Sequence, residues 1–183
     1  MPLILGTLAS AVTANAAPPA FESIGTYAIT STTASVTFSS IPQTYKHLQI
    51  RGVITNPANG GFNSMRMNGD SSTASYIQHF MYANTPTVAA GANLTGQSSI
   101  NVGGLSYGIS ATSPRIFIVD LLDYKDTNKN SVVRIMTGED ENGAGEVTFQ
   151  SGTWLNTAAV TSLTFLVSNS YTAGSHIALY GVL

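Results

Sequence analysis

Short runs of alternating apolar and polar residues recur along this chain, separated by glycine, proline and asparagine. Such alternation turns one face of an extended segment toward a core and the other toward solvent, which is the pattern of a half-buried β-strand. No stretch shows the 3.6-residue period of an amphipathic helix. The segments that fit the strand pattern are 24–30, 34–39, 47–54, 63–68, 76–82, 99–102, 115–122, 132–136, 146–151, 162–167 and 177–182.

Strong turn signals separate these segments, among them Asn68-Gly69, Gly103-Gly104 and Asn142-Gly143. Many short strands at such spacing, with no internal repeat of fixed period, predict an all-β fold, specifically an antiparallel β-sandwich of the jelly-roll kind. Segment 84–114 is the least regular part of the chain. We expect long surface loops around one short strand there, where contacts to partners tend to reside.

The first twenty residues differ from the rest. They begin with apolar residues, continue with small ones, and end at Pro18-Pro19, which stops any helix and favours an extended chain. We therefore predict an extended N-terminal anchoring arm over residues 1–20 and one jelly-roll-like β-sandwich domain over residues 21–183. The same stretch imitates a secretory signal, but it has no Lys or Arg among its first residues.

The arm carries apolar side chains that have no core of their own to join. Burying each of them on a partner is worth roughly 1.5–3 kcal/mol, which offsets the ordering cost of a flexible tail. We therefore expect the arm to bind a neighbouring subunit, for which adding a strand to a sheet edge is one route. The predicted partner-binding residues of the arm are Leu3, Ile4, Leu5, Leu8 and Val12.

Charge is scarce. Only 9% of the 183 residues are charged, with 7 Lys and Arg against 9 Asp and Glu, whereas ordinary soluble domains have roughly 25%. Solubility then comes from hydroxyl and amide groups, or other chains cover much of the surface. The scattered basic residues give no footprint for nucleic acid, so we predict no nucleic-acid partner. No apolar run approaches the roughly 18–20 residues of a membrane helix, so we predict no membrane insertion.

Residues that carry catalytic chemistry do not form a convincing motif. The chain has no Cys, which excludes thiolate catalysis and Cys-based zinc sites. Gly104-Leu105-Ser106-Tyr107-Gly108 matches the G-x-S-x-G of serine hydrolases and is followed by Asp120, Asp123 and His176, but no helix follows the serine as that mechanism requires. We predict no catalytic residue, no cofactor and no enzymatic activity. An esterase or a glycosidase is the third alternative.

Two acidic segments invite a metal interpretation. Asp126–Asn130 has the spacing that opens a calcium loop, but Ser131 and Thr137 stand where that loop needs Gly and Glu. Glu139-Asp140-Glu141 is interpreted as an exposed acidic turn. We predict no metal site, and the alternative that either segment binds a cation stays open. The histidines fall in separate strand-like segments, without another histidine at ligand spacing: His47, His79 and His176.

Several aromatic residues lie close to the breakers. The simpler interpretation is that their rings pack on the rim of the sandwich. The alternative is a stacking platform for sugar rings, for which we single out Tyr82, Tyr107 and Trp154 as contacts to glycan or to a partner. The full set comprises Tyr76, Phe80, Tyr82, Tyr107 and Trp154.

Two stretches carry a family resemblance. The start Met1-Pro2-Leu3-Ile4-Leu5-Gly6-Thr7 resembles one shared by structural proteins of marine and cyanobacterial tailed phages. Phe21-Glu22-Ser23-Ile24 together with Ser35–Arg51 is similar to the first third of a β-domain found in phage virion and tail-fibre-like proteins. Similar signatures follow at Met65–Asp70, Gly152–Leu163 and Ala178–Val182.

The resemblance implies a non-enzymatic virion structural protein, assembled in the host cytoplasm. The leading hypothesis is a capsid decoration or cement protein, attached through its arm to the major capsid protein or to tail proteins. The alternative is a tail or head fibre component, an adhesin that binds host surface glycan. The resemblance also implies a homo-oligomer, with trimers the commonest arrangement in phage fibres and decorations.

Overall fold

The computed structural model describes residues 20–56, 61–105 and 108–183, and within these ranges the chain forms β-strands and no helix. All strand pairs are antiparallel, which confirms the predicted all-β, antiparallel sandwich. The strands are β1 (Phe21–Ala28), β2 (Thr33–Phe38), β3 (His47–Ile54), β4 (Asn63–Met67), β5 (Tyr76–Asn84), β6 (Thr87–Gln97), β7 (Ile100–Asn101), β8 (Arg115–Leu122), β9 (Ser131–Glu141), β10 (Ala144–Trp154), β11 (Leu163–Tyr171) and β12 (His176–Val182).

Eight of the strands form a jelly roll. They pair in a nested way along the chain, β1 with β12, β2 with β11, β3 with β8 and β4 with β7. The pairs β1·β12 and β3·β8 lie side by side in one sheet, and the pairs β2·β11 and β4·β7 lie side by side in the other. This nesting of strand pairs across two packed sheets is the double Greek key of jelly-roll proteins.

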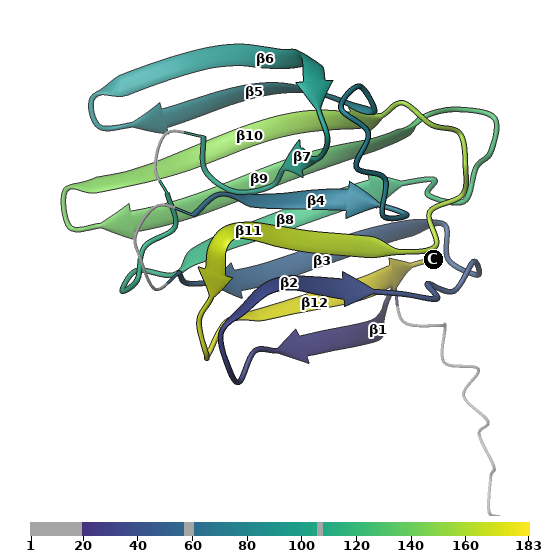
Figure 1. Ribbon diagram of the computed structural model, residues 1–183, viewed down its shortest axis with the longest axis horizontal. Coiled ribbons are helices and arrows are strands. Elements are labelled where there is room, and N and C mark those ends of the chain that lie inside the picture. Colours follow the sequence, from purple (N-terminus) through teal and green to yellow (C-terminus); the bar gives the residue numbers. More distant parts are fainter. Residues whose placement is uncertain (1–19, 57–60, 106–107) are drawn as a thin grey trace, which may run out of the picture.

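The other four strands extend one sheet only. The hairpin β5–β6 is inserted between β4 and β7, and the hairpin β9–β10 between β8 and β11, yet both join the sheet of β8, which then has the order β1-β12-β3-β8-β9-β10-β5-β6. The smaller sheet, β2-β11-β4-β7, covers part of this larger sheet, and β5 and β6 lie beyond it (Figure 1). We call β5, β6, β9 and β10 the extension.

The jelly-roll part holds the apolar core between the two sheets. The ring of Phe165 on β11 packs edge-on against Phe38, at 6.2 Å between centroids, and at an interplanar angle of 31° against Phe117 on β8, at 5.8 Å. Phe165 and Phe117 are almost fully buried, together with Ile50 and Leu179 from the larger sheet. Because every one of these strands alternates apolar residues inward, the pattern predicted from sequence matches the observed core.

Strand β6 departs from the sequence prediction, which had loops over most of segment 84–114. Residues Thr87–Gln97 pair with β5 in a hairpin that runs from Asn84 opposite Thr87 to Tyr76 opposite Gln97. The segment TVAAGANLTGQ has few β-branched residues and no aromatic residue, and most of it is exposed on both faces. This segment forms a strand because β5 offers it backbone hydrogen-bond partners, and its own β propensity contributes little.

The turn between β9 and β10 follows the prediction. Asn142 and Gly143 both have positive φ, 29° and 99°, as the two central residues of a tight hairpin turn require. This turn sets the register in which Glu139 lies directly opposite Glu146. The hairpin is longer than the predicted segments 132–136 and 146–151, because its polar ends are also strand.

Candidate functional site on the sheet extension

The inward face of the extension is apolar where Tyr76, Val133, Ile135 and Trp154 join the core, and polar farther along β9 and β10. Thr137 and Glu139 on β9 and Glu146, Thr148 and Gln150 on β10 are all buried, between 1% and 8% exposed. Polar groups removed from water need partners. Their partners come from neighbouring strands and from the connecting segment, residues 98–105 and 108–114, which contains β7 at the edge of the smaller sheet.

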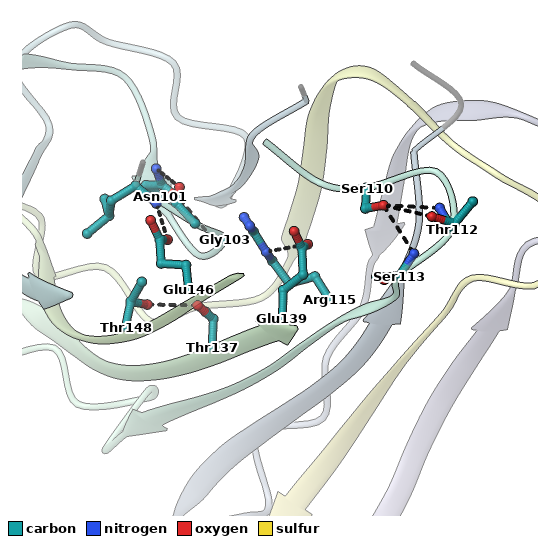
Figure 2. Close-up of polar contacts among 12 residues, drawn as sticks. Asn101, Gly103, Ser110, Thr112, Ser113, Arg115, Thr137, Glu139, Glu146 and Thr148 are labelled. Carbon is teal, nitrogen blue, oxygen red and sulfur yellow. Dashed lines mark hydrogen bonds and ion pairs between the residues drawn. The ribbon is translucent and has the colours of Figure 1, made fainter. Parts of the chain in front are cut away.

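A chain of hydrogen bonds ties that segment to the sheet. The Thr137 and Thr148 hydroxyl oxygens lie 2.8 Å apart (Figure 2). Gln150 Nε2 donates to Thr148 Oγ1 at 2.9 Å and to the Gly103 carbonyl at 3.0 Å. From β5, Gln78 Nε2 donates to the Asn101 carbonyl at 2.7 Å. The side-chain amides of Gln78 and Gln150 thus satisfy backbone carbonyls of the connecting segment.

A buried ion pair holds the other end of the same segment. Arg115 Nε lies 3.1 Å from Glu139 Oε2, and both side chains are 1% exposed (Figure 2). Burial raises the pKa of Glu139, and the Arg115 guanidinium opposes that rise. The prediction of an exposed acidic turn is wrong for Glu139, because β9 continues to Glu141 and carries this carboxylate inward.

The second buried carboxylate also has a partner in the segment. Glu146 stands directly opposite Glu139 on the neighbouring strand, and its Oε1 accepts a hydrogen bond from the Leu105 amide at 2.7 Å. Two like charges opposite each other destabilise a sheet unless cations or N–H groups compensate them. Here Arg115 compensates one and the Leu105 amide the other, so the pair fixes the position of residues 103–105.

The residues that follow the G-x-S-x-G motif do not assemble a hydrolase triad among the described residues. Ser106 and Tyr107 lie outside the described residues. Asp120 accepts from Gln49 at 2.7 Å and pairs with Arg134 at 2.8 Å, while Asp123 pairs with Lys129 at 2.6 Å. Neither aspartate has His176 as a partner; that histidine is exposed on β12.

The calcium-like spacing of Asp126–Asn130 forms a turn closed by its own groups. Asp126 Oδ1 accepts from the Asn128 amide at 2.8 Å, and Lys129 Nζ lies 3.4 Å from Asp126 Oδ2 and 2.6 Å from Asp123 Oδ2. The Lys129 ammonium therefore occupies the position that a cation would take between these carboxylates. Within the described ranges no group of three or more His, Cys, Asp or Glu side chains is arranged to hold a metal ion.

The outward face of the extension is apolar. A row of side chains crosses four strands, from Ile118 opposite Met136, to Phe149, to Met81, and a second row runs beside it. A shallow groove of about 200 Å³ lies among the rings and aliphatic chains of this face. We call the set the outer apolar face; its residues are between 38% and 82% exposed and comprise Met81, Val88, Ile116, Ile118, Met136, Val147 and Phe149.

A polar network borders this face toward the jelly-roll part. Arg134 pairs with Asp120, Gln49 Nε2 donates to Asp120, and Arg51 Nε donates to Gln49 Oε1 at 2.7 Å. Arg51 also lies over the rings of Phe21 and Tyr180, 5.3 Å and 5.1 Å from their centroids. The outward face of the large sheet is therefore polar around Gln49, Arg51, Asp120 and Arg134 and apolar at the outer apolar face.

The predicted aromatic contacts separate in the structure. Trp154 is 1% exposed and its Nε1 donates to Asp70 Oδ2 at 2.8 Å, so its ring has no free face for a sugar and the prediction of a contact there is wrong. Tyr76 is equally buried, and its hydroxyl donates to the Asp70 carbonyl at 3.0 Å. Tyr107 lies outside the described residues, and Tyr82 is half-buried on β5.

Tyr82 lines a surface hollow of about 400 Å³ on the inward side of the extension, where the smaller sheet has ended. The other lining residues come from the start of β4, from β5, β6 and β7, and from the segment that Glu146 holds. Sequence reasoning missed Phe62 and Asn93, because neither stands in a motif and only the fold brings them together. The lining comprises Phe62, Phe80, Tyr82, Asn93, Asn101 and Leu105.

The predicted arm residues Leu3, Ile4, Leu5, Leu8 and Val12 lie outside the described residues, and β1 begins at Phe21. In the part of the chain that the structure covers, no helix has the length and apolar character to span a membrane. Neither the protein-family models nor the curated proteins contain a match to this chain.

Proposed function

We propose that this protein is a non-enzymatic structural subunit of a tailed-phage particle, a capsid decoration protein fastened by its N-terminal arm and packed against neighbouring subunits through the outer apolar face. The phage assignment rests on the sequence resemblance. The assembly role rests on the geometry, and its main support is the exposure of the outer apolar face.

This exposure is the observation that carries the proposal. Soluble proteins rarely expose contiguous apolar patches unless a partner covers them. On β10 the apolar Val147 and Phe149 face outward, 55% and 48% exposed, while Glu146, Thr148 and Gln150 are buried. The apolar residues on the outward face of β10 leave water only when a partner covers them. Neighbouring subunits in a particle would provide such a cover.

The described carboxylates support a structural role as well. Glu139 and Glu146 both line the broad hollow of about 960 Å³ at the end of the extension, where a pair of acids could serve hydrolysis. Each has a fixed partner, the Arg115 guanidinium and the Leu105 amide. Their positions are accounted for by holding the connecting segment in place.

Strand β6 offers a docking edge for the arm of a neighbouring subunit. It is the last strand of the large sheet, eleven residues long, and contains no charged residue and no proline. Natural proteins usually block such an edge with charges or prolines, because its free N–H and C=O groups can pair with another chain. An apolar arm that adds a strand here would satisfy those groups and bury its own aliphatic residues.

The anchoring role is tested by deleting residues 1–17. Particles assembled without the wild-type protein are incubated with the truncated or the full-length chain, sedimented, and assayed for bound protein. The proposal expects the truncated chain to stay folded and to lose particle association. Retained association would refute the anchor.

The outer apolar face is tested separately by Phe149→Lys, with Leu155→Lys as the matched control. Leu155 is similarly exposed, at 45%, but lies in the loop after β10 and outside the face. Phe149→Lys should abolish packing on the particle, and Leu155→Lys should leave it intact. Equal binding by both variants would contradict the assigned face.

The alternative function is a tail or head fibre component that binds host glycan, and the aromatic hollow at Tyr82 favours it. Copy number separates the two functions. Hundreds of copies per particle on a quantitative gel indicate capsid decoration, and a few to a few dozen indicate a fibre or tail component.

A further inference from the structure

We propose that the hollow lined by Phe62, Tyr82 and Asn93 is a binding site for a neutral oligosaccharide. This inference goes beyond the architectural role, and it holds whether the subunit sits on the capsid or on a fibre. The hollow has the volume of a small-ligand site, about 400 Å³ against the roughly 300–1,000 Å³ typical of such sites.

The rings of the hollow provide an apolar floor. Phe62 is 40% exposed, and the rings of Phe80 and Tyr82 lie 6.5 Å apart at an interplanar angle of 36°. A pyranose ring has an apolar C–H face and a rim of hydroxyl groups, so its face gains by leaving water against an aromatic ring while its rim still needs hydrogen bonds. Phe62, Phe80 and Tyr82 supply ring surface for the C–H face, and Asn93 and the Tyr82 hydroxyl supply polar groups for the rim.

The polar groups of the hollow are available. Among the described residues, neither the Tyr82 hydroxyl nor the Asn93 side-chain amide has a hydrogen-bond partner, and both residues are half-buried. An amide offers two donors and an acceptor, and a phenol offers one of each, which matches the mixed donors and acceptors of sugar hydroxyls.

The walls of the hollow are fixed in advance. The Asn101 side chain accepts from the Gly103 amide at 2.8 Å and donates to the Gly104 carbonyl at 3.1 Å, and Glu146 holds the Leu105 amide. The Gly61 carbonyl accepts from the Ile109 amide at 2.9 Å, which places Phe62 beside this wall. A site built before its ligand arrives loses less entropy on binding.

The lining also selects the class of ligand. None of the six lining residues is charged. An anionic sugar would lose hydration of its carboxylate without gaining a cation, so the site favours uncharged saccharides.

The test is calorimetric titration of the full-length chain with maltohexaose, cellohexaose and chitohexaose, with hexagalacturonic acid as the anionic comparator. At least one neutral hexamer should bind with a dissociation constant in the millimolar range or tighter, and the anionic one more weakly. Phe62→Ala should weaken binding about tenfold or more and Asn93→Ala about fivefold. Phe149→Ala, which removes an exposed ring on the opposite face, should leave binding unchanged.

Two results would overturn the site. The first is the absence of binding by all three neutral hexamers at millimolar concentration. The second is binding that survives both Phe62→Ala and Asn93→Ala. Circular dichroism shows whether each variant is folded, and Asn93→Ala tests the site even where Phe62→Ala perturbs the fold. Because the titration uses purified protein without particles, its failure is distinct from a failure of the arm to anchor.

Discussion

The jelly-roll part and the extension share the large sheet but differ in the kind of side chain that they bury. Between the two sheets the jelly-roll part buries aromatic and aliphatic side chains, with Phe165 at the centre. The outer part of the extension buries threonine, glutamine and glutamate side chains under the connecting segment and turns Met136, Val147 and Phe149 outward. The first arrangement stabilises the fold through burial of apolar area, whereas the second positions the connecting segment and leaves apolar area exposed on the other face.

This contrast shows that the element packed on a sheet face determines which side chains that face can bury. A second sheet presents apolar side chains, whereas a connecting segment presents backbone N–H and C=O groups that demand hydrogen bonds. The side chains of Gln78, Gln150 and Glu146 meet that demand. The stability of the two parts should therefore respond to different kinds of substitution.

The largest effect is expected in the jelly-roll part. Phe165→Ala leaves a cavity among buried rings and should lower the free energy of unfolding by about 3–5 kcal/mol. Phe149→Ala on the outer face should change it by less than about 0.5 kcal/mol in the isolated chain. Urea unfolding measures both, and equal losses would break the contrast between the inner and outer faces.

Breaking the buried ion pair comes next. Arg115→Met leaves Glu139 without its guanidinium and should cost about 3 kcal/mol, at the low end for such pairs because burial already raises the pKa of Glu139 and favours its protonation. The double variant Arg115→Met/Glu139→Gln should recover most of the loss. Hydrogen exchange should accelerate in β9 and β10 and stay unchanged in β3 and β12; uniform acceleration would contradict a local role.

A smaller effect is expected from the neutral hydrogen bonds. Thr148→Val keeps the shape of the side chain but removes the partner of the Thr137 hydroxyl and of Gln150 Nε2, which should cost about 1–2 kcal/mol. Ser151→Ala, on the outward face of the same strand, is the control and should be neutral within about 0.5 kcal/mol. A loss no larger than that of the control would show that these bonds add nothing to stability.

The smallest expected effect depends on pH and concerns the boundary between the two parts. Asp70, which follows β4, accepts from the indole of Trp154 at the end of β10, and this bond together with the Ser72 amide lowers the pKa of Asp70 to about 2. A lowered folded-state pKa gives stability that is present above the ordinary value of about 4 and is lost as the pH falls toward 2.

Trp154 itself supplies the measurement, since the chain has 1 Trp. Urea midpoints followed by its fluorescence should fall between about pH 4 and pH 2. Asp70→Asn should lower stability at neutral pH and flatten this dependence. A variant with the same slope as the wild-type chain would assign the acid sensitivity to other carboxylates.

Sequence reasoning predicts much of the jelly-roll part, because β2, β3, β8 and β11 each alternate with apolar residues inward. It fails in the extension for a physical reason. In the sequence Glu146-Val147-Thr148-Phe149-Gln150, alternation alone would bury Val147 and Phe149, yet the structure buries the other three residues. The parity of a strand says which residues share a face and does not say what covers that face.

Two further features depend on contacts distant in sequence. Strand β6 needs backbone pairing with β5, and the hollow needs Phe62, just ahead of β4, brought together with Asn93 on β6. Trp154 was expected near the rim and is buried because Asp70, 84 positions away, accepts its N–H. Neither local propensity nor residue spacing predicts such contacts between residues distant in sequence.

The pairing of β1 with β12 has a mechanical consequence. Phe21 at the start of β1 lies opposite Val182, and Arg51 stacks on the Phe21 ring. Any tension carried by the residues ahead of Phe21 therefore acts first on β1, an edge strand that pairs with β12 only. If the proposed arm tethers the subunit, its resistance to pulling depends on the pairing of β1 with β12. This pairing lies far from the polar interior of the extension.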